Sequence, residues 1–449
     1  MDMQYYQLGG HRAAISLHGG QYGTQRDFFT PLQRHLRRPD ESIELVLGIK
    51  PSGSSHLLLT WEEAKLFEPD RYLFKKSSPA TEFYSLSPIV FKDAKQLEEK
   101  LDNLTPKKSG ARDTSRLNKG YEGQSHGAGR SRVESARVFY RILRNRLDQG
   151  KYNIRDTSWA SSIRIVTFSC NTWLSDTRSL AQRNANPRVL DVGWSEASLP
   201  DLGDEQKTYS HIQFANNINL APGGDENTKR EPFQWGASQL CSPQEIKDKV
   251  QGLFGEFSST RPVVLVVHNW DSNPGNNAVP VKNVLWSLDI NVDAVTLDLK
   301  DLMWPPVRRY APKDPRRPRS ASPTPHNRSS RRPSPPPPPR SFEQVYVVDV
   351  GDMSRKIFGT QDCYSLSQMR RRLGMYEDQG FCAGNECRML FEVFREMAKR
   401  GPIDDQKEEW PLGTLAASAS VPSASASEPS ASLAFHDDES DYGEEDESD

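Results

Sequence analysis

The chain has 449 residues, of which 35% are hydrophobic and 26% charged, and its formal net charge is −2 at pH 7. This hydrophobic fraction is too small for a packed core throughout, so we expect one well-packed domain together with long disordered segments. The five scattered cysteines show no Cys-x-x-Cys spacing, which argues against a disulfide framework and a zinc site. The N-terminus has no signal-peptide pattern, and no apolar run is long enough for a membrane span, which argues against a membrane partner. Together these features favour an intracellular protein of the nucleus, the cytoplasm or both.

The N-terminal region, residues 1–104, is weakly patterned and does not predict a particular fold. Within it, segments 42–49 and 56–61 have the composition of strands, and 93–104 has the composition of a helix. We therefore expect some regular structure in this region but cannot assign its architecture.

A flexible basic linker is predicted at 105–131, where glycine, serine and basic residues dominate. A lead-in helix is expected within 132–160, because apolar residues recur there at roughly helical spacing from Val138 onwards. Gly150 is a suitable stop for that helix, since glycine readily adopts the left-handed conformation found at helix ends.

The main domain is predicted at 161–401, and it begins with three strands. Segments 163–170, 187–197 and 209–216 carry β-branched or alternating apolar residues with short connections, which is typical of an antiparallel meander. Helices and strands then alternate. The alternating segments are a capped helix from Ser242, a strand at 262–270, a helix from Val281, a strand region at 291–302, a strand at 344–350, a helix at 365–374 and a last helix from Asn385.

This order predicts an α/β fold with a mixed sheet, in which three antiparallel strands precede alternating strands and helices, and helices cover both faces. Sheets of this kind bind ligands at the carboxyl ends of their central strands. In this sequence that rim carries Ser169–Asn171, His268–Asp271 and Asp349–Asp352.

Six motifs in this region resemble, in order and spacing, the C-terminal domain of a fungal family described as "good for full DEAD-box helicase activity". The resemblance covers about residues 160–401 and implies the RNase H-like fold of DEDD-type exonucleases. The motifs are "IVTFSCNTW" (165–173), "VLDVGWSEA" (189–197), "FQWGAS" (233–238), "VVLVVHNW" (263–270), "VYVVDVGDM" (345–353) and "FCAGNE" (381–386).

The resemblance implies a nuclease site that has lost its chemistry. Active members of the wider class carry Asp-x-Glu at the end of the first strand, where the carboxylates hold two metal ions that activate water. Ser169 and Asn171 stand at these positions, and their neutral oxygens are poor ligands for hard divalent cations. The family's His-Asn-Ala-Gly-Asn-Asp corresponds to 381–386, where Phe381 cannot act as a base and Glu386 is one methylene longer than aspartate. We therefore expect no catalytic residue, bound metal or cofactor.

Each rim residue also has a structural interpretation. Glu386 suits the positive end of a helix, His268 is typical of a satisfied histidine beside a strand, and Asp349 could cap the turn after its strand. Either Asn269 or Asp271 could stand for the middle aspartate of the class, and the sequence leaves this choice open. Four tryptophans could stack on bases or pack in the core, namely Trp173, Trp194, Trp235 and Trp270.

A disordered insertion is predicted at 305–341, because proline at this density removes the hydrogen-bond donors that a sheet needs. It carries nine Arg and one Lys against one Asp, which suits contact with phosphates. Its segment 332–340 favours polyproline II and could dock an SH3 or WW domain. The Ala/Ser-rich and acidic tail at 402–449 is also predicted to be disordered, and its acidic end could fold back on the insertion.

Three functions follow as hypotheses. The first is a non-catalytic RNase H-like domain that binds nucleic acid, RNA in particular, or acts as an adaptor in RNA–protein particles. The second is a 3′–5′ exonuclease in which rearranged carboxylates hold Mg²⁺ or Mn²⁺, drawn from Asp271, Asp349, Asp352 and Glu386. The third is a protein-interaction scaffold that uses the insertion and the tail. The candidate nucleic-acid-binding residues are His268, Asn269, Asp271, Asp349, Glu386, Arg308, Arg309, Arg316, Arg317 and Arg319.

Overall fold

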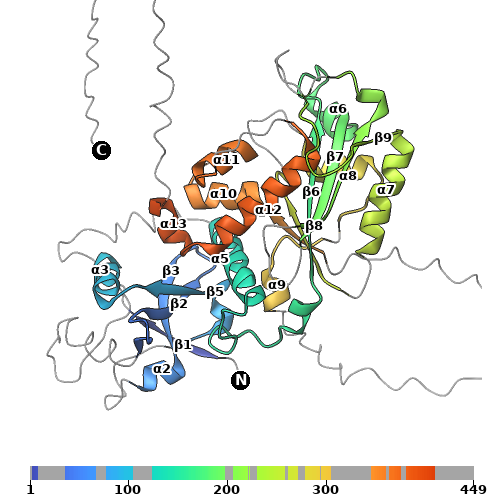
Figure 1. Ribbon diagram of the computed structural model, residues 1–449. Helices are drawn as coiled ribbons and strands as arrows, with labels where there is room; N and C mark the ends of the chain where they lie inside the picture. Colours follow the sequence, from blue (N-terminus) through green and yellow to red (C-terminus); the bar gives the residue numbers. More distant parts are fainter. Residues whose placement is uncertain are drawn as a thin grey trace, which may run out of the picture. The chain divides into compact units, whose positions relative to one another are not determined.

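The computed structural model contains two β-sheets with helices packed on them, all within the compact unit Met1–Pro411 (Figure 1). The described residues are 3–8, 36–66, 77–104, 124–197, 206–220, 222, 230–257, 261–271, 279–293, 295–304, 345–360, 364–375 and 381–409. The predicted insertion at 305–341 lies outside them, and so does the tail beyond residue 409. Among these residues, no helix is both long enough and apolar enough to cross a bilayer.

The first sheet belongs to the N-terminal region and is antiparallel, with the order β4-β1-β3-β2-β5. Its strands are β1 Gln4–Leu8, β2 Ile43–Ile49, β3 Ser55–Thr60, β4 Ser77–Pro79 and β5 Ser85–Phe91, and its short helices are α2 Trp61–Lys65 and α3 Ala94–Leu104. The predicted strands at 42–49 and 56–61 and the helix at 93–104 are confirmed. Every residue of β2 is buried, because side chains from its two faces enter two different hydrophobic clusters. Such a strand reads as a continuous apolar run without alternation.

The second sheet is mixed and has the order β11-β10-β6-β7-β8-β9. Its strands are β6 Arg164–Thr172, β7 Val189–Ala197, β8 Gln206–Phe214, β9 Gln239–Cys241, β10 Val263–Val267 and β11 Val345–Asp349. β6, β7 and β8 pair antiparallel, which confirms the predicted meander. β10 runs parallel to β6, and β11 runs parallel to β10. The α/β class and the mixed sheet are therefore confirmed.

Helices cover both faces of the second sheet. On one face, Val264 and Val266 of β10 join a cluster with α5 (Gln124–Leu143) and α12 (Ala383–Lys399). On the other face, Val263, Leu265 and Val267 pack with α7 (Pro243–Glu256) and α8 (Val281–Ser287). Figure 1 shows α12 and α7 on opposite sides of the strands. The capping box predicted at Ser242 is present at the start of α7.

Helix α5 corrects the linker and lead-in helix predicted from the sequence. Residues 124–131 are helical rather than part of a flexible linker, and the helix ends at Leu143, before Gly150. The glycines that suggested a linker are needed for close packing, since a Cβ on Gly127 would collide with the backbone carbonyl of Pro51. A Cβ on Gly129 would meet the end of the flexible Lys356 side chain, which can move aside more easily. Glycine here reflects a tight helix contact and not chain flexibility.

Several further elements differ from the predictions. The remaining helices are α6 Leu180–Ala185, α9 Lys300–Met303, α10 Val350–Phe358, α11 Leu366–Arg372 and α13 Ile403–Glu409, with short 3-10 turns at Ala80–Glu82, Ser158–Ser161 and Ala215–Asn217. The described residues of segment 291–302 (291–293 and 295–302) form no strand, and Thr296 pairs with β11 through a single bridge. α10 was not predicted, and α12 begins at Ala383 instead of Asn385. The capped helix predicted at 365–374 is confirmed as α11.

Helix α13 corrects the prediction that everything from residue 402 onwards is disordered. Its Asp404 pairs with Arg130 of α5, and both side chains are largely buried. The backbone N–H of Ile403 donates a 2.7 Å hydrogen bond to the carboxylate of Glu134, which is fully buried. A buried cation is tolerated when an acid pairs with it, so these contacts fix the first acidic residues after the main domain in place.

Candidate functional site

A cavity of about 290 Å³ lies at the carboxyl ends of β6 and β10, and we call it the β6 pocket. It gathers six residues singled out in the sequence, namely Ser169, Asn171, His268, Asn269, Phe381 and Glu386. They come from strand ends in the middle of the sheet and from the start of α12, which packs against β6 and β7. The rim predicted from the strand order is therefore a real cavity.

The centre of the β6 pocket is a hydrogen bond between a strand and a helix. The Ser169 hydroxyl, on β6, donates to Glu386 Oε2 at 2.5 Å, and Glu386 stands in the first turn of α12. Burial raises the pKa of the Glu386 carboxyl to about 7, and the nearby Asp191 charge adds to the effect, while the Ser169 hydrogen bond opposes it. At neutral pH this carboxyl is therefore divided between its neutral and ionised forms.

A second carboxyl, Asp191 of β7, lies directly behind the pocket wall and was not identified from the sequence. It is 1% exposed, and its Oδ1 accepts hydrogen bonds from Asn171 Nδ2 at 3.0 Å and from the Ala383 backbone N–H at 3.1 Å. Burial raises its pKa to about 6, against these hydrogen bonds. His211 Nε2 lies 3.9 Å from Asp191 Oδ1, and burial lowers the pKa of His211 to about 4, so the imidazole is neutral.

Two glycines allow α12 to begin directly on top of β7. A Cβ on Gly193 would lie 2.5 Å from the backbone of Ala383 and Gly384, so only glycine permits this approach. Gly384 in turn faces the ring of Phe233 and the Cβ of His211, which a Cβ on Gly384 would approach to within 2.6 and 2.8 Å. Gly384 of "FCAGNE" thus leaves room for Phe233 and His211, and Gly193 lets the helix start come close enough for the Ala383 N–H to reach Asp191.

Asn385, His268 and Asn269 hold loops around the pocket. The Asn385 side chain does not cap α12; it accepts from the Gln234 N–H and donates to the Pro232 carbonyl, both at 3.0 Å. His268 Nε2 lies 3.0 Å from the Tyr364 carbonyl, and burial lowers the pKa of the histidine. Asn269 adopts a left-handed conformation with φ of 64°, which asparagine tolerates better than most residues.

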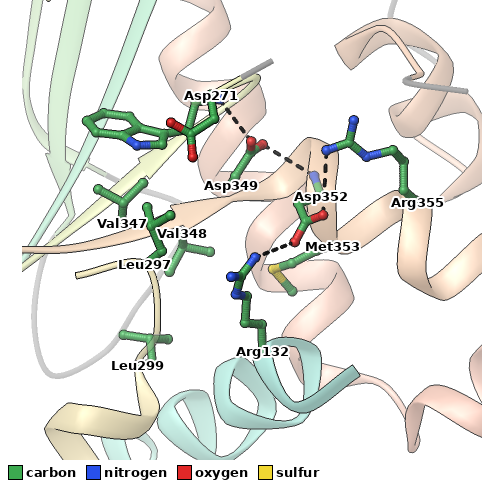
Figure 2. Close-up of a pocket in the computed structure, with 11 residues that line it drawn as sticks. Arg132, Asp271, Leu297, Leu299, Val347, Val348, Asp349, Asp352, Met353 and Arg355 are labelled. Carbon is green, nitrogen blue, oxygen red and sulfur yellow. Dashed lines mark hydrogen bonds and ion pairs between the residues drawn. The ribbon is translucent and has the colours of Figure 1, made fainter. Parts of the chain in front are cut away.

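A second, smaller cavity of about 110 Å³ lies at the end of β11, and we call it the β11 pocket (Figure 2). Asp349 lines it and caps α10. Its carboxylate accepts the N–H groups of Asn269 at 3.1 Å, Trp270 at 2.9 Å, Gly351 at 2.8 Å and Asp352 at 3.3 Å. The capping interpretation of Asp349 accounts for its geometry without a ligand.

The other two acids of the β11 pocket are paired with cations. Asp352 lies between Arg132 Nη1 at 3.1 Å and Arg355 Nη2 at 3.5 Å, as the dashed lines in Figure 2 show. Asp271 Oδ1 lies 3.7 Å from Lys282 Nζ. Three of the four acids of the exonuclease hypothesis therefore share this cavity, whereas Glu386 lines the β6 pocket. Within the described part of the chain, no three His, Cys, Asp or Glu side chains are arranged to hold a metal ion.

The donor set of the β6 pocket does not fit a two-metal centre. Such a centre needs several carboxylates that stay ionised and bridge the ions, because hard divalent cations favour carboxylate oxygen. Here the strand end offers a hydroxyl and an amide, and Glu386, the one carboxylate in the wall, has a raised pKa. We therefore derive no metal-dependent step at this site.

The remaining predicted residues cannot be placed. The described residues do not include Arg308, Arg309, Arg316, Arg317 and Arg319, nor the 332–340 segment expected to bind SH3 or WW domains.

In comparisons with known proteins, no protein-family model and no curated protein matched the chain.

Proposed function

We propose that residues 161–401 form an RNase H-like domain that binds single-stranded nucleic acid, RNA in particular, without two-metal hydrolysis. The strand order supports this proposal. β6, β7 and β8 form an antiparallel meander, and β10 and β11 then add in parallel on the other side of β6. This is the succession that the sequence resemblance implies, with α12 entering the sheet beside the end of β6.

The observation that carries the proposal is the use made of Ser169 and Asn171. Both stand where metal-holding acids are expected, and each donates a hydrogen bond to a carboxyl: Ser169 at 2.5 Å to Glu386 in the pocket wall, and Asn171 at 3.0 Å to Asp191 behind it. A pair of acids at these positions would face two further acids and would need a cation between them. The neutral pair instead stabilises the wall without one.

The chemistry of the β6 pocket suits the uncharged parts of a nucleotide. Among the described residues, its polar lining consists of hydroxyl, amide, imidazole and carboxyl groups, without lysine or arginine. Ribose hydroxyls and base edges can both donate and accept hydrogen bonds, and RNA adds the 2′-hydroxyl to that set. Phosphates would require cations from elsewhere, and the nine arginines of the 305–341 insertion are the largest supply in the sequence.

Salt titrations of RNA binding test this proposal. Each phosphate neutralised by a cation releases counterions, so affinity should fall steeply with salt, with a slope of roughly 0.7 per contact on single strands. Replacing five arginines by serine should flatten the slope and weaken binding to all sequences alike. The five are Arg308, Arg309, Arg316, Arg317 and Arg319. Deleting 436–449 should strengthen binding, because it removes acids that compete with the phosphates.

The outcome also separates the other hypotheses. If the intact chain, the arginine variant and the tail deletion all fail to bind RNA near physiological salt, the proposal is wrong, and the scaffold hypothesis becomes the stronger one. No observation favours the exonuclease hypothesis, since its acids divide between two cavities. Adaptor and SH3 or WW binding roles remain predictions from the sequence.

A further inference from the structure

Trp235 is a large aromatic residue held in a stack on the protein surface. It is 38% exposed, and its ring stacks on Tyr209 of β8 with centroids 5.4 Å apart and planes 22° from parallel. The guanidinium carbon of Arg388, on α12, lies 4.2 Å from the centroid of the Trp235 ring. We call Tyr209, Trp235 and Arg388 the aromatic platform.

The loop that carries Trp235 is exposed but firmly anchored. Residues 234–240 are all exposed, while the fully buried Asn385 holds Pro232 and Gln234 by two hydrogen bonds of 3.0 Å. On the far side of Trp235, Ser238 hydrogen-bonds His211 Nδ1 at 2.8 Å. An exposed ring with buried anchors on both sides loses little freedom when a ligand binds, which favours affinity.

The platform differs from the other tryptophans that the sequence offered for base stacking. Trp270 is 2% exposed and packs in the core. Trp194 packs against that same cluster, and Trp173 lies under Arg188 at 5.0 Å, both only partly exposed. Trp235 alone of the four is more than a third exposed.

The platform and the β6 pocket share the start of α12. Glu386 lines the pocket, and Arg388 of the platform follows two residues later on the same helix. Phe381, also in the pocket wall, accepts a 3.2 Å hydrogen bond at its carbonyl from the Glu231 N–H, at the root of the Trp235 loop. The platform and the β6 pocket are therefore both attached to the start of α12, through Arg388 on one side and through Glu386 and Phe381 on the other.

We propose that the aromatic platform stacks on an unpaired base of the single-stranded nucleic acid bound by this domain; this inference rests on the proposed function. Every base has a π-face, so such stacking tolerates different sequences. Removal of one stacking ring is expected to weaken binding by about 5- to 150-fold. Binding that involves only phosphates would be insensitive to the removal of this ring.

The test uses the full chain with labelled single-stranded oligoribonucleotides, and with matched strands whose bases have been removed. Trp235→Ala and Trp235→Leu should bind the normal strand at least about 5-fold more weakly, and Trp235→Phe should retain most of the affinity. The salt slope should not change, because no phosphate contact is lost. Trp286→Ala is the matched control, since Trp286 is 49% exposed on α8, away from the platform.

Each result decides the matter. Loss of affinity for the normal strand but not for the abasic strand supports stacking. An equal loss of affinity on both strands would contradict base stacking by the aromatic platform, and so would unchanged affinity in Trp235→Leu while the intact chain binds RNA. In both cases the proposed function would still hold. If the intact chain binds neither strand, the proposed function falls, and the platform falls with it.

Discussion

The two pockets at the carboxyl rim of the second sheet both contain acids, yet they stabilise them in opposite ways. In the β11 pocket, Asp352 is paired with two arginines and Asp349 accepts four backbone N–H groups. In the β6 pocket, Glu386 and the adjacent Asp191 receive hydrogen bonds from neutral groups, and burial raises the pKa of both. Acids near a sheet rim therefore do not by themselves indicate a metal site, because the groups that contact each carboxyl determine whether it needs a metal ion.

Because their acids are stabilised differently, the two pockets should respond differently to mutation and to pH. Removal of Asp349 or Asp352 would leave the backbone N–H groups and arginines that now contact them without these partners. For Glu386 and Asp191, burial outweighs the hydrogen bonds and, for Asp191, the nearby charge of Arg230, so the folded state favours the protonated form of each. The β11 pocket should therefore be sensitive to truncation, and the β6 pocket to pH.

Asp349→Ala should produce the larger loss of stability. It would leave four backbone N–H groups without their acceptor, two at the start of α10 and two in the turn after β10, and we expect a loss of about 2–3 kcal/mol in the free energy of unfolding. Urea denaturation of the full chain measures it. Asp271→Ala is the control from the same pocket, since Asp271 is 51% exposed with a single 3.7 Å ion pair and should lose less than about 1 kcal/mol. Equal losses in the two variants would contradict the capping role.

Glu386→Gln should have an effect that changes with pH. The folded-state pKa of Glu386 is raised from 4.5 to about 7, so between these values the folded protein holds a proton that the unfolded chain has released. Stability from this group is fully present below pH 4.5 and is lost as pH rises through 7, with a limiting slope of about 1.4 kcal/mol per pH unit. The glutamine variant should flatten this part of the stability profile.

Denaturation of the native chain and of Glu386→Gln from pH 5 to about pH 8 measures the difference. The raised pKa of Asp191, about 6, acts in the same direction and should remain in the variant. Identical profiles for the two proteins would mean that Glu386 is ionised in the folded state, and the contrast between the pockets would then be lost.

The sequence predicted strands and capped helices well where their signals are local. The meander β6–β8, the buried strand β10 and the capping boxes of α7 and α11 depend on nearby residues. α10 was missed although Asp349 and Gly359, which has φ of 64°, mark its two ends. The start of α5 was missed because its glycines serve a distant contact that composition cannot reveal.

The candidate site was predicted in part for the same reason. Motif positions identified Ser169, Asn171 and Glu386, but not Asp191 or His211. Asp191 pairs with Asn171 across β6 and β7, and His211 stands opposite Gly193 across β7 and β8. Strand register decides both contacts, and the sequence motifs do not specify which residues face each other across neighbouring strands. An acid inside the apolar strand 189–197 was the one signal that could have drawn attention to Asp191.

The most direct test of the central claim is a nuclease assay of the full chain with end-labelled single-stranded RNA in Mg²⁺ or Mn²⁺, beside Glu386→Ala. We predict that the RNA stays at full length with both proteins, and that its binding persists when EDTA removes divalent ions, because Ser169 and Asn171 leave no carboxylate set for two metals. Metal-dependent shortening from the 3′ end by the native chain, lost in Glu386→Ala, would contradict a non-catalytic β6 pocket.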